Sequence, residues 1–352
     1  MLYFINKSNL SRFFLKLFSS RRIFGLKPAD GGQYLWSEFT SLDVDNLDIG
    51  KYRAMEPAKM FFFPSSEILS SKNTSGDKKS VSPGLHDDDT ARPIVIAGLK
   101  SCDMRLFHTA DNIFLGGVAE DDFYKQKRSP SVLITSDCTD ARPGCFCTKM
   151  GLNPWPEKNF DINLSPIGDG YVAECGSNIG EDLVKQSPNL FQKAIDQQIR
   201  EREKNRRAIY EKVSSQNSRF TWKEPGKILE DTFLAEIWKT DIARTCVECD
   251  GCRWACGSCY CFLLGETDNF WDKIRTWDSC QSTGYARVAG GANPRREKYQ
   301  RLRNYYMCKL VYRPKNFSLP ACSGCGRCIE TCPGKIDIRE SLQKLFDSVK
   351  NT

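Results

Sequence analysis

Histidine is scarce in this 352-residue chain, which has only His86 and His108 for general acid–base chemistry near neutral pH. The sequence also lacks the G-x-x-x-x-G-K-[ST] phosphate loop, the G-x-G-x-x-G dinucleotide fingerprint and the G-x-S-x-G motif of hydrolases. No apolar run approaches the roughly 20 residues of a membrane-spanning helix, so we expect no membrane span. With two histidines and none of these motifs, the chain is expected to make no bonds of its own.

Cysteine, in contrast, is abundant, with 17 in the chain. The number is odd and no secretory signal peptide is present, so disulfide bonds are disfavoured. Thiolates that bind metal in a reducing compartment explain the cysteines better. The formal net charge of +7 would by itself point to nucleic acid or an anionic membrane as a partner.

The strongest motif is a repeated cysteine spacing, Cys246-x2-Cys249-x2-Cys252-x3-Cys256 and Cys322-x2-Cys325-x2-Cys328-x3-Cys332-Pro333. This is the spacing of bacterial ferredoxins with two [4Fe–4S] clusters, in which three cysteines of one loop bind three corners of a cube. The fourth corner is bound by the last cysteine of the other motif. The pattern therefore predicts one cluster on Cys246, Cys249, Cys252 and Cys332, and another on Cys322, Cys325, Cys328 and Cys256.

Two details of these motifs complete the prediction. Gly251, Gly324 and Gly326 are expected to allow the tight turns of the loops. Zinc is the alternative metal, but tetrahedral zinc sites use separated pairs of ligands and not runs of three plus one. We therefore expect at least two [4Fe–4S] clusters.

A further set of cysteines, in the N-terminal half, comprises Cys102, Cys138, Cys145 and Cys147. Cys102 follows one predicted buried strand and Cys138 ends the next, and ligands of open α/β sheets bind beyond the carboxyl ends of such strands. This set predicts a third cluster, and the alternative is four buried or idle thiols. A possible fourth set is Cys259, Cys261, Cys280 and Cys308, whose alternative is structural cysteines beside the other clusters. Only Cys175 is left over.

Apolar runs at residues 93–98 and 131–135, with a helical segment at 104–114 between them, predict a βαβ unit with parallel strands. Residues 164–177 predict a hairpin, and the polar residues 70–92, which include His86, predict an exposed loop. Ser8 or Asn9 is expected to cap the first helix, with strands at 23–26 and 33–36 after it. The alternative for residues 1–29, which carry six basic residues and no acid, is an organellar transit peptide.

The domain organisation predicted from these elements has three parts. Residues 1–190 form an α/β domain with a mixed sheet, residues 191–242 a helical connector, and residues 243–352 a mainly helical, ferredoxin-like dicluster domain. The 65 residues between the motifs are too many for a compact ferredoxin, so we expect the helical type found in large oxidoreductase complexes. The highly charged residues 200–207 indicate a solvated helix face, with contact to nucleic acid as the alternative.

Seven short segments, together with both ferredoxin motifs, resemble the 4Fe–4S dicluster family of the sulfhydrogenase beta subunit, which also includes the iron–sulfur electron-transfer subunit of anaerobic sulfite reductase. They span most of the chain: residues 57–64 (PAKMFFFP), 100–103 (KSCD), 145–147 (CFC), 168–172 (GDGYV), 259–262 (CYCF), 277–281 (WDSCQ) and 289–295 (AGGANPR). The chain departs from the family at Ala292, where a histidine is common, and at Gly257-Ser258, where Pro-Thr is common.

The resemblance implies a cytoplasmic electron-transfer subunit. In the family, such a subunit connects a flavin-containing NAD(P)H-oxidising subunit to a catalytic subunit, such as a hydrogenase, a sulfite reductase or a heterodisulfide-reductase-like enzyme. Two other functions stay open: a metal-stapled nucleic-acid-binding protein, and a stand-alone reductase with a substrate-binding cluster. Three clusters of about −2 each would lower the +7 to about +1, and a fourth would bring it to about −1, which weakens the case for nucleic acid.

Overall fold

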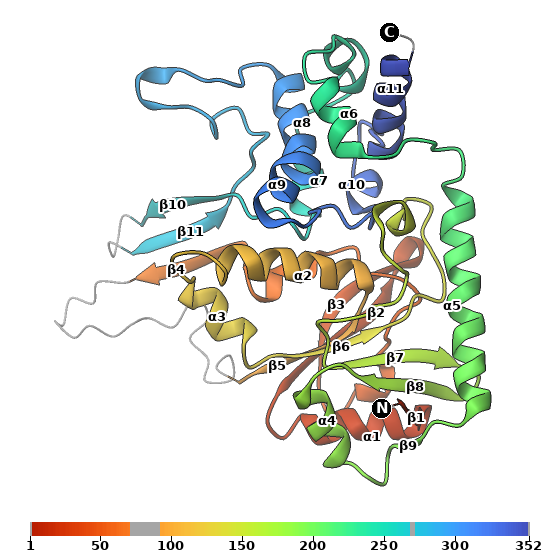
Figure 1. The fold of residues 1–352 in the computed structure, drawn as a ribbon. Coiled ribbons are helices and arrows are strands. Elements are labelled where there is room, and N and C mark those ends of the chain that lie inside the picture. The colour runs from red at the N-terminus through yellow and green to blue at the C-terminus, as the bar shows by residue number, and fades with distance from the viewer. Residues whose placement is uncertain (1, 71–91, 268–271, 351–352) are drawn as a thin grey trace, which may run out of the picture.

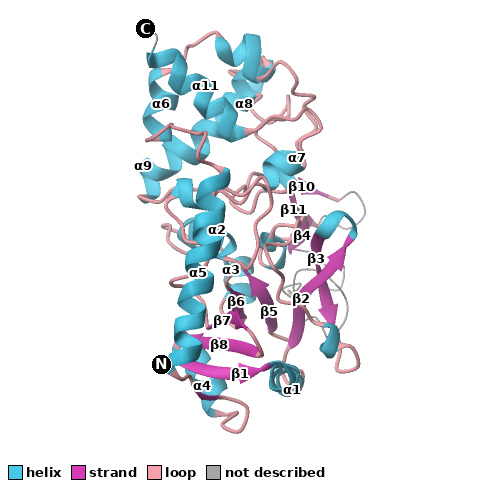
Figure 2. Cartoon of the chain, turned by 90° about the vertical axis from the view of Figure 1, so that its right-hand side faces the viewer, coloured by secondary structure: helices cyan, strands magenta, loops and turns pink. Residues whose placement is uncertain are grey.

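A computed structural model describes residues 2–70, 92–267 and 272–350, so His86 and nearly all of the predicted loop at 70–92 lie outside the described residues. The molecule is elongated, with a β-sheet at one end and a helical region at the other (Figure 1). The sheet and the helical region are also seen at opposite ends after a quarter turn (Figure 2). No helix within the described residues is both long enough and apolar enough to cross a membrane.

The N-terminal half is built on an eight-stranded mixed sheet with the strand order β3-β2-β5-β6-β7-β8-β1-β9. Its centre, β2, β5, β6 and β7, is parallel, and the remaining pairs are antiparallel. The strands are β1 (Leu2–Asn6), β2 (Arg22–Ala29), β3 (Gln33–Phe39), β5 (Ile94–Leu99), β6 (Val132–Ser136), β7 (Ile162–Ile167), β8 (Gly170–Cys175) and β9 (Gln192–Lys193). The predicted mixed sheet is confirmed.

The apolar sequences of β5 and β6 explain their position in the middle of this sheet. Every residue of β6 and all but the first of β5 are buried, as expected for parallel strands that are covered on both faces. Helix α2 (Ser101–Phe114) follows β5, and α3 (Asp122–Arg128) leads into β6, so the predicted βαβ unit is confirmed. The predicted hairpin is also confirmed, as β7 and β8.

The first helix, α1 (Lys7–Leu17), buries Leu10, Phe13, Phe14 and Leu17 against the sheet, as the apolar periodicity predicts. It begins earlier than predicted. Asn6, and not Ser8 or Asn9, is the N-cap residue, because its side-chain oxygen accepts a hydrogen bond of 2.8 Å from the Asn9 backbone N–H. Strand β1 just before it pairs with β8 and β9, which places residues 2–17 within the folded domain.

Helices α4 (Asn178–Lys185) and α5 (Asp196–Gln216) complete this half. Helix α5 runs along one side of the molecule, from the sheet toward the helical half (Figures 1 and 2). Its charged stretch is not wholly solvated, because Arg202 and Arg206 are 8% and 9% exposed. Arg206 donates to Asp137 just after β6 at 2.7 Å. This ion pair connects α5 to the sheet, so the predicted solvated face does not include Arg206.

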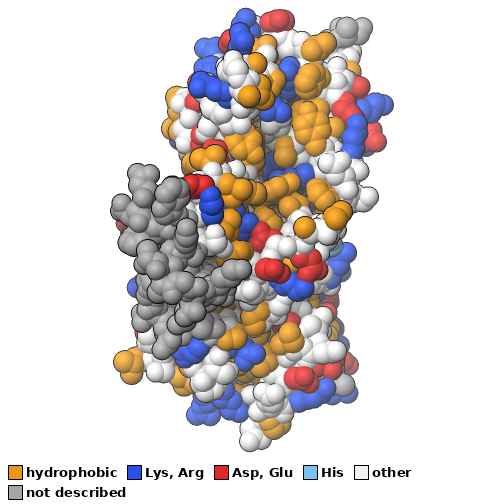
Figure 3. Space-filling model, turned by 90° about the vertical axis from the view of Figure 1, so that its left-hand side faces the viewer, with side chains coloured by type: hydrophobic (Ala, Val, Ile, Leu, Met, Phe, Trp, Pro, Cys, Tyr) orange, Lys and Arg blue, Asp and Glu red, His pale blue; other side chains and the backbone are white. Residues whose placement is uncertain are grey.

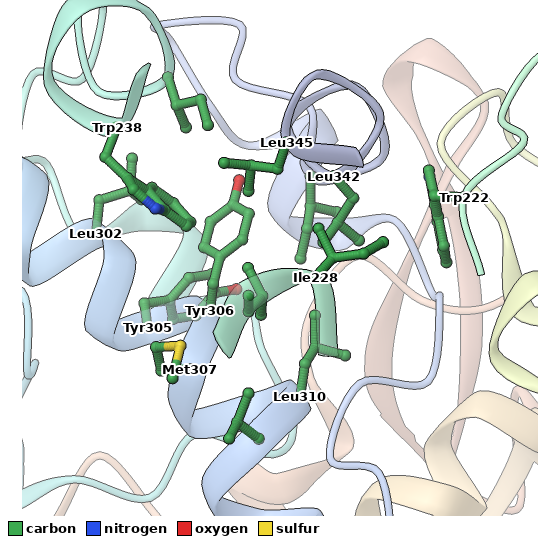
Figure 4. Close-up of a cluster of buried hydrophobic side chains, with 14 of the residues drawn as sticks. Trp222, Ile228, Trp238, Leu302, Tyr305, Tyr306, Met307, Leu310, Leu342 and Leu345 are labelled. Carbon is green, nitrogen blue, oxygen red and sulfur yellow. The ribbon is translucent and has the colours of Figure 1, made fainter. Parts of the chain in front are cut away.

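The C-terminal half is a group of short helices around one apolar core. The helices are α6 (Pro225–Asp231), α7 (Gly251–Trp254), α8 (Lys298–Met307), α9 (Arg313–Phe317), α10 (Arg327–Glu330) and α11 (Ile338–Lys350). Figure 4 shows Trp222, Trp238, Tyr306, Leu310 and Leu342 meeting in this core. The predicted helical connector at 191–242 is not one continuous helix: α6 ends at Asp231, and a π-helical turn occupies Trp238–Ile242.

A small second sheet, which the sequence analysis does not predict, joins the two halves. It has the order β10-β11-β4, with β4 (Ser66–Ser70) from the N-terminal half and β10 (Phe262–Glu266) and β11 (Lys273–Trp277) from the C-terminal half. Arg275 of β11 donates to Glu67 of β4 at 2.8 Å, and both side chains are buried. The chain therefore crosses between the halves more than once.

The interface between the halves also contains buried ion pairs. Arg327 donates to Asp103 at 2.7 Å, and neither side chain is more than 1% exposed. Arg53 donates to Glu330 at 2.7 Å and to the carbonyl oxygen of Cys325 at 2.7 Å. Charges held so far from water fix one relative placement of the two halves, because a shifted interface would leave them unpaired.

Replacing Asp103 with asparagine should therefore destabilise the protein by about 3–5 kcal/mol, because Arg327 would remain buried without a counter-charge. The measurement is the midpoint of urea unfolding of the holoprotein. Glu340→Gln is the control, since its partner Arg219 is 66% exposed and such pairs contribute about 1 kcal/mol or less. Equal losses in the two variants would contradict this account of the interface.

Candidate metal centres

The loop that carries Cys322, Cys325 and Cys328 turns on two glycines. Gly324 and Gly326 lie on either side of Cys325 and have left-handed φ angles of 66° and 75°. A Cβ on Gly324 would lie 2.6 Å from the backbone of Phe146, so the close approach of the N-terminal half also requires glycine here. The predicted role of these two glycines is confirmed.

The loop that carries Cys246, Cys249 and Cys252 has the same backbone pattern with different residues. Glu248 and Asp250 lie on either side of Cys249, with φ angles of 56° and 58°. The prediction that Gly251 makes this turn is wrong, because Gly251 begins α7 and Asp250 takes the left-handed conformation. The Asp250 carboxylate accepts hydrogen bonds from Ser279 and Ser282, at 2.6 and 2.9 Å, which hold this uncommon conformation.

Each of three cavities is lined by one predicted set of four cysteines. The first cavity is lined by Cys246, Cys249, Cys252 and Cys332. The second cavity is lined by Cys256, Cys322, Cys325 and Cys328. The third cavity is lined by Cys102, Cys138, Cys145 and Cys147.

The first two cavities bring together cysteines that are distant in sequence. Cys332 comes from the second motif but lines the first cavity, and Cys256 comes from the first motif but lines the second. This is the exchange of the fourth cysteine that the ferredoxin spacing predicts. In the third cavity, Cys102 lies in the first turn of α2 and Cys138 lies just after β6, at the carboxyl ends of two parallel strands.

The three cavities form a row because adjacent members share a wall. Cys328 lines both the first and the second cavity, and Cys325 lines both the second and the third. The backbone links them as well: the Phe146 N–H donates to the Gly324 carbonyl at 2.7 Å, between the loops of the second and third cavities. The second cavity therefore lies between the other two.

Within the described residues, no three His, Cys, Asp or Glu side chains converge in the way that a single metal ion requires. A cube of iron and sulfide binds each thiolate at a different corner, so its four ligands surround a volume and do not meet at a point. The arrangement of four cysteines around each cavity is of this second kind.

Comparison with known proteins agrees with this geometry. Residues 245–336 match the family model described as a 4Fe-4S dicluster domain. These residues form a 4Fe-4S dicluster domain. The chain is also homologous to the sulfhydrogenase 2 subunit beta of Pyrococcus furiosus, with 27% identity over 345 residues that cover 96% of each chain. No solved structure shows a significant match to the chain.

A dicluster domain accounts for two [4Fe–4S] clusters, which makes this an iron–sulfur protein with a role in electron transfer. The thiols of the cavities fit such a group. Burial raises the pKa of Cys252, Cys322 and Cys138 to about 12, so these side chains would stay protonated at neutral pH by themselves. Iron ions supply the positive charge that turns buried thiols of this kind into thiolate ligands.

Buried cations around the dicluster domain fit anionic clusters as well. Arg253, Arg313 and Arg327 are at most 3% exposed, and each has a side-chain nitrogen without a hydrogen-bond partner among the described residues. Arg105, whose charge acts on Cys322, has another such nitrogen. Unpaired N–H donors are costly in a protein interior, and a cluster with its sulfides and thiolates would supply negative charge and acceptors for them. These buried arginines agree with the expectation that negative clusters offset much of the formal net charge of +7.

The fourth predicted set is arranged differently from the other three. Cys261 and Cys280 lie at the open end of the β10–β11 hairpin, where the Asp278 N–H donates to the Cys261 carbonyl at 2.9 Å. A hydrogen bond from Cys280, together with the charge of Arg253, lowers the pKa of Cys261 to about 5. The Cys259 thiol donates a hydrogen bond to Cys256. Cys308 begins a π-helical turn. None of the described cavities is lined by all four, and a cluster on this set stays a prediction.

Cys175 is separate from all of these sets. It ends β8, where it pairs with Ile162 of β7, and it lines none of the three cavities. The position agrees with its being left over in the cysteine assignment. Burial in the sheet raises its pKa, as expected for a structural thiol.

The sequence motifs do not predict the side chains that donate to the cysteine sulfurs. Lys309 donates to Cys256 and Cys259 at 2.9 and 3.1 Å, and Gln281 donates to Cys252 at 3.1 Å. One signal for Lys309 is present in the sequence, since it is the one charged residue in the otherwise apolar segment 305–312 (YYMCKLVY). A lone lysine in such a helix segment indicates a buried charge with a specific partner.

Proposed function

We propose that this chain is the iron–sulfur relay subunit of a multisubunit oxidoreductase and that it holds three [4Fe–4S] clusters in series. The ligand sets are the four cysteines of the first cavity, the four of the second and the four of the third. When bound, each cluster takes up and releases one electron. The observation that carries the proposal is the row of three cysteine-lined cavities with shared walls.

The surroundings of the cavities suit electron transfer better than catalysis. Cys102, Cys145 and Cys147 of the third cavity are at most 9% exposed, and the second cavity lies within the protein between the other two. At the first cavity, however, Cys249 is exposed and the neighbouring Val247 is 63% exposed. The first cavity is therefore the end of the row where a cofactor of another subunit can approach.

A partner subunit is supported by the exposed apolar surface near the small sheet. Figure 3 shows hydrophobic side chains gathered across the middle of the face on which β4, β10 and β11 lie in Figure 1. Strand β10 is an edge of its sheet, and its Leu263 and Leu264 are 58% and 62% exposed. An exposed apolar edge strand in a soluble domain usually marks a surface that another chain covers.

We propose that the partners are a flavin-containing subunit that oxidises NAD(P)H and a catalytic redox subunit, and that the assembly is cytoplasmic. The homologous protein is named as a subunit of a sulfhydrogenase, and similarity over 96% of both chains supports a shared role within a complex. The buried, paired state of Arg202 and Arg206 supports this function over nucleic-acid binding, because these residues of the charged segment are not available to phosphates.

The test is anaerobic purification of the chain from its native host together with the proteins bound to it. We expect a flavoprotein to copurify, and NAD(P)H to bleach the iron–sulfur absorbance in the complex but not in the isolated chain. Turnover by the isolated chain with a physiological donor would instead favour the stand-alone reductase. Binding to DNA or RNA that falls steeply with salt would favour the nucleic-acid function.

A further inference from the structure

We propose that Lys309 raises the reduction potential of the cluster in the second cavity above that of the cluster in the first cavity. The inference rests on the proposed function, because it requires clusters in these cavities. It goes beyond that function by giving a defined role to a residue that is not a ligand. It also states which of the two clusters of the dicluster domain holds an electron more tightly.

The contacts of Lys309 fit a charged ammonium group. Lys309 lies in the π-helical turn Cys308–Tyr312, and its side chain is 2% exposed. Its Nζ donates to Cys256 Sγ at 2.9 Å, to Ser258 Oγ at 2.9 Å and to Cys259 Sγ at 3.1 Å. An ammonium has three N–H donors and no acceptor, so three acceptors satisfy it completely. Figure 4 shows its neighbours Tyr305, Met307 and Leu310 among the apolar side chains of the core.

Lys309 differs from the other buried cations of this region in what it contacts. Lys59 donates to the Cys259 carbonyl at 2.8 Å, and Arg313 donates to the Ser258 carbonyl. Among the hydrogen bonds of the described residues, Lys309 is the one lysine or arginine side chain that donates to a cysteine sulfur. Its charge is therefore directed at a proposed ligand of the second cluster, and not at the surrounding backbone.

The first cavity has no equivalent of this contact among the described residues. There the side-chain donor to a cysteine sulfur is Gln281, whose neutral amide lies 3.1 Å from Cys252 Sγ. Lys298 is the nearby lysine, but it donates to the carbonyl oxygens of Arg244 and Cys246, both at 3.1 Å, and it is only partly buried. The two cavities of the dicluster domain thus differ by one buried positive charge in contact with a thiolate.

The sign of the effect follows from charge. A cluster gains one negative charge when it is reduced, so a nearby cation stabilises the reduced state more than the oxidised state. Water and salt screen this interaction weakly in the protein interior. Lys309 therefore raises the midpoint potential of the second cluster. Of the two clusters of the dicluster domain, the second therefore holds an electron more tightly than the first.

The experiment is an EPR-monitored titration of the full-length holoprotein with dithionite. In the wild type, the second cluster should be reduced before the first. In Lys309→Met, we expect the ratio of reduced to oxidised second cluster at a fixed poise to fall about tenfold or more, which is about 59 mV for a one-electron couple. Lys309→Gln should also lower the ratio of reduced to oxidised second cluster, while Lys309→Arg should keep this ratio near the wild-type value. The signal of the second cluster is identified as the one that Cys256→Ser alters.

Lys298→Met is the matched control, because it removes the same charge from a lysine that donates only to backbone carbonyls. It should leave the potential of the second cluster unchanged. Iron is counted in every variant. Unchanged potentials in Lys309→Met and Lys309→Gln with full iron would overturn the inference, and so would loss of the second cluster from both. Absence of iron and sulfide from the wild type would instead overturn the proposed function itself.

Discussion

Replacing Cys256 with alanine should remove the same cluster as replacing Cys325 with alanine, although the two cysteines belong to different motifs. Each variant is expected to lose about four iron atoms per chain and the same EPR signal, because both thiolates line the second cavity. The loss should also stop electron flow between the first and third cavities, since the second lies between them. Iron analysis and EPR of the dithionite-reduced protein are the measurements.

The control for this prediction is Cys175→Ala, which should keep all of its iron because Cys175 lies in the sheet at the end of β8. Cys249→Ala and Cys332→Ala should form a second matching pair, with loss of the first cluster instead. If Cys256→Ala matched Cys249→Ala in its EPR spectrum, the exchange of the fourth ligand between the motifs would be refuted.

Replacing Cys102 with alanine should remove a third cluster and leave both clusters of the dicluster domain in place. Cys102 lines the third cavity with Cys138, Cys145 and Cys147, all outside residues 245–336. We expect a loss of about four iron atoms per chain, with the EPR signals of the other two clusters retained. The measurement is iron content together with EPR of the reduced variant.

Two further variants make this result specific to the third cavity. Cys138→Ala should reproduce the loss, because Cys102 and Cys138 lie beyond the carboxyl ends of the parallel strands β5 and β6. Cys261→Ala tests the fourth set in the same way, and a loss of four iron atoms there would add a fourth cluster to the row. Full iron content in Cys102→Ala would show that the cysteines of the third cavity are ordinary buried thiols.

Much of the fold and the cysteine sets could be predicted because their signals are local. Strands β5 and β6 are short apolar runs, α1 has a helical apolar period, and the ferredoxin loops have fixed spacings. The third set could be predicted because the carboxyl ends of parallel strands meet at one edge of a sheet.

What could not be predicted depends on contacts between distant residues. Strand β4 pairs with β11 across some two hundred residues, and no local pattern records such a partner. The burial of Arg327 and Lys309 depends on Asp103 and on Cys256, which come from other parts of the chain. The left-handed conformation of Asp250 is stabilised by hydrogen bonds from Ser279 and Ser282, which lie about 30 residues away in the sequence. Without knowledge of these contacts, the sequence favours the neighbouring Gly251 as the turn residue.

The most direct test of three clusters in series is the iron and acid-labile sulfide content of the anaerobically purified chain. The row of three cavities predicts about twelve iron and twelve sulfide per chain. About eight of each would limit the clusters to the dicluster domain, and about sixteen would add one on the fourth set. Two zinc ions without sulfide would contradict the account altogether.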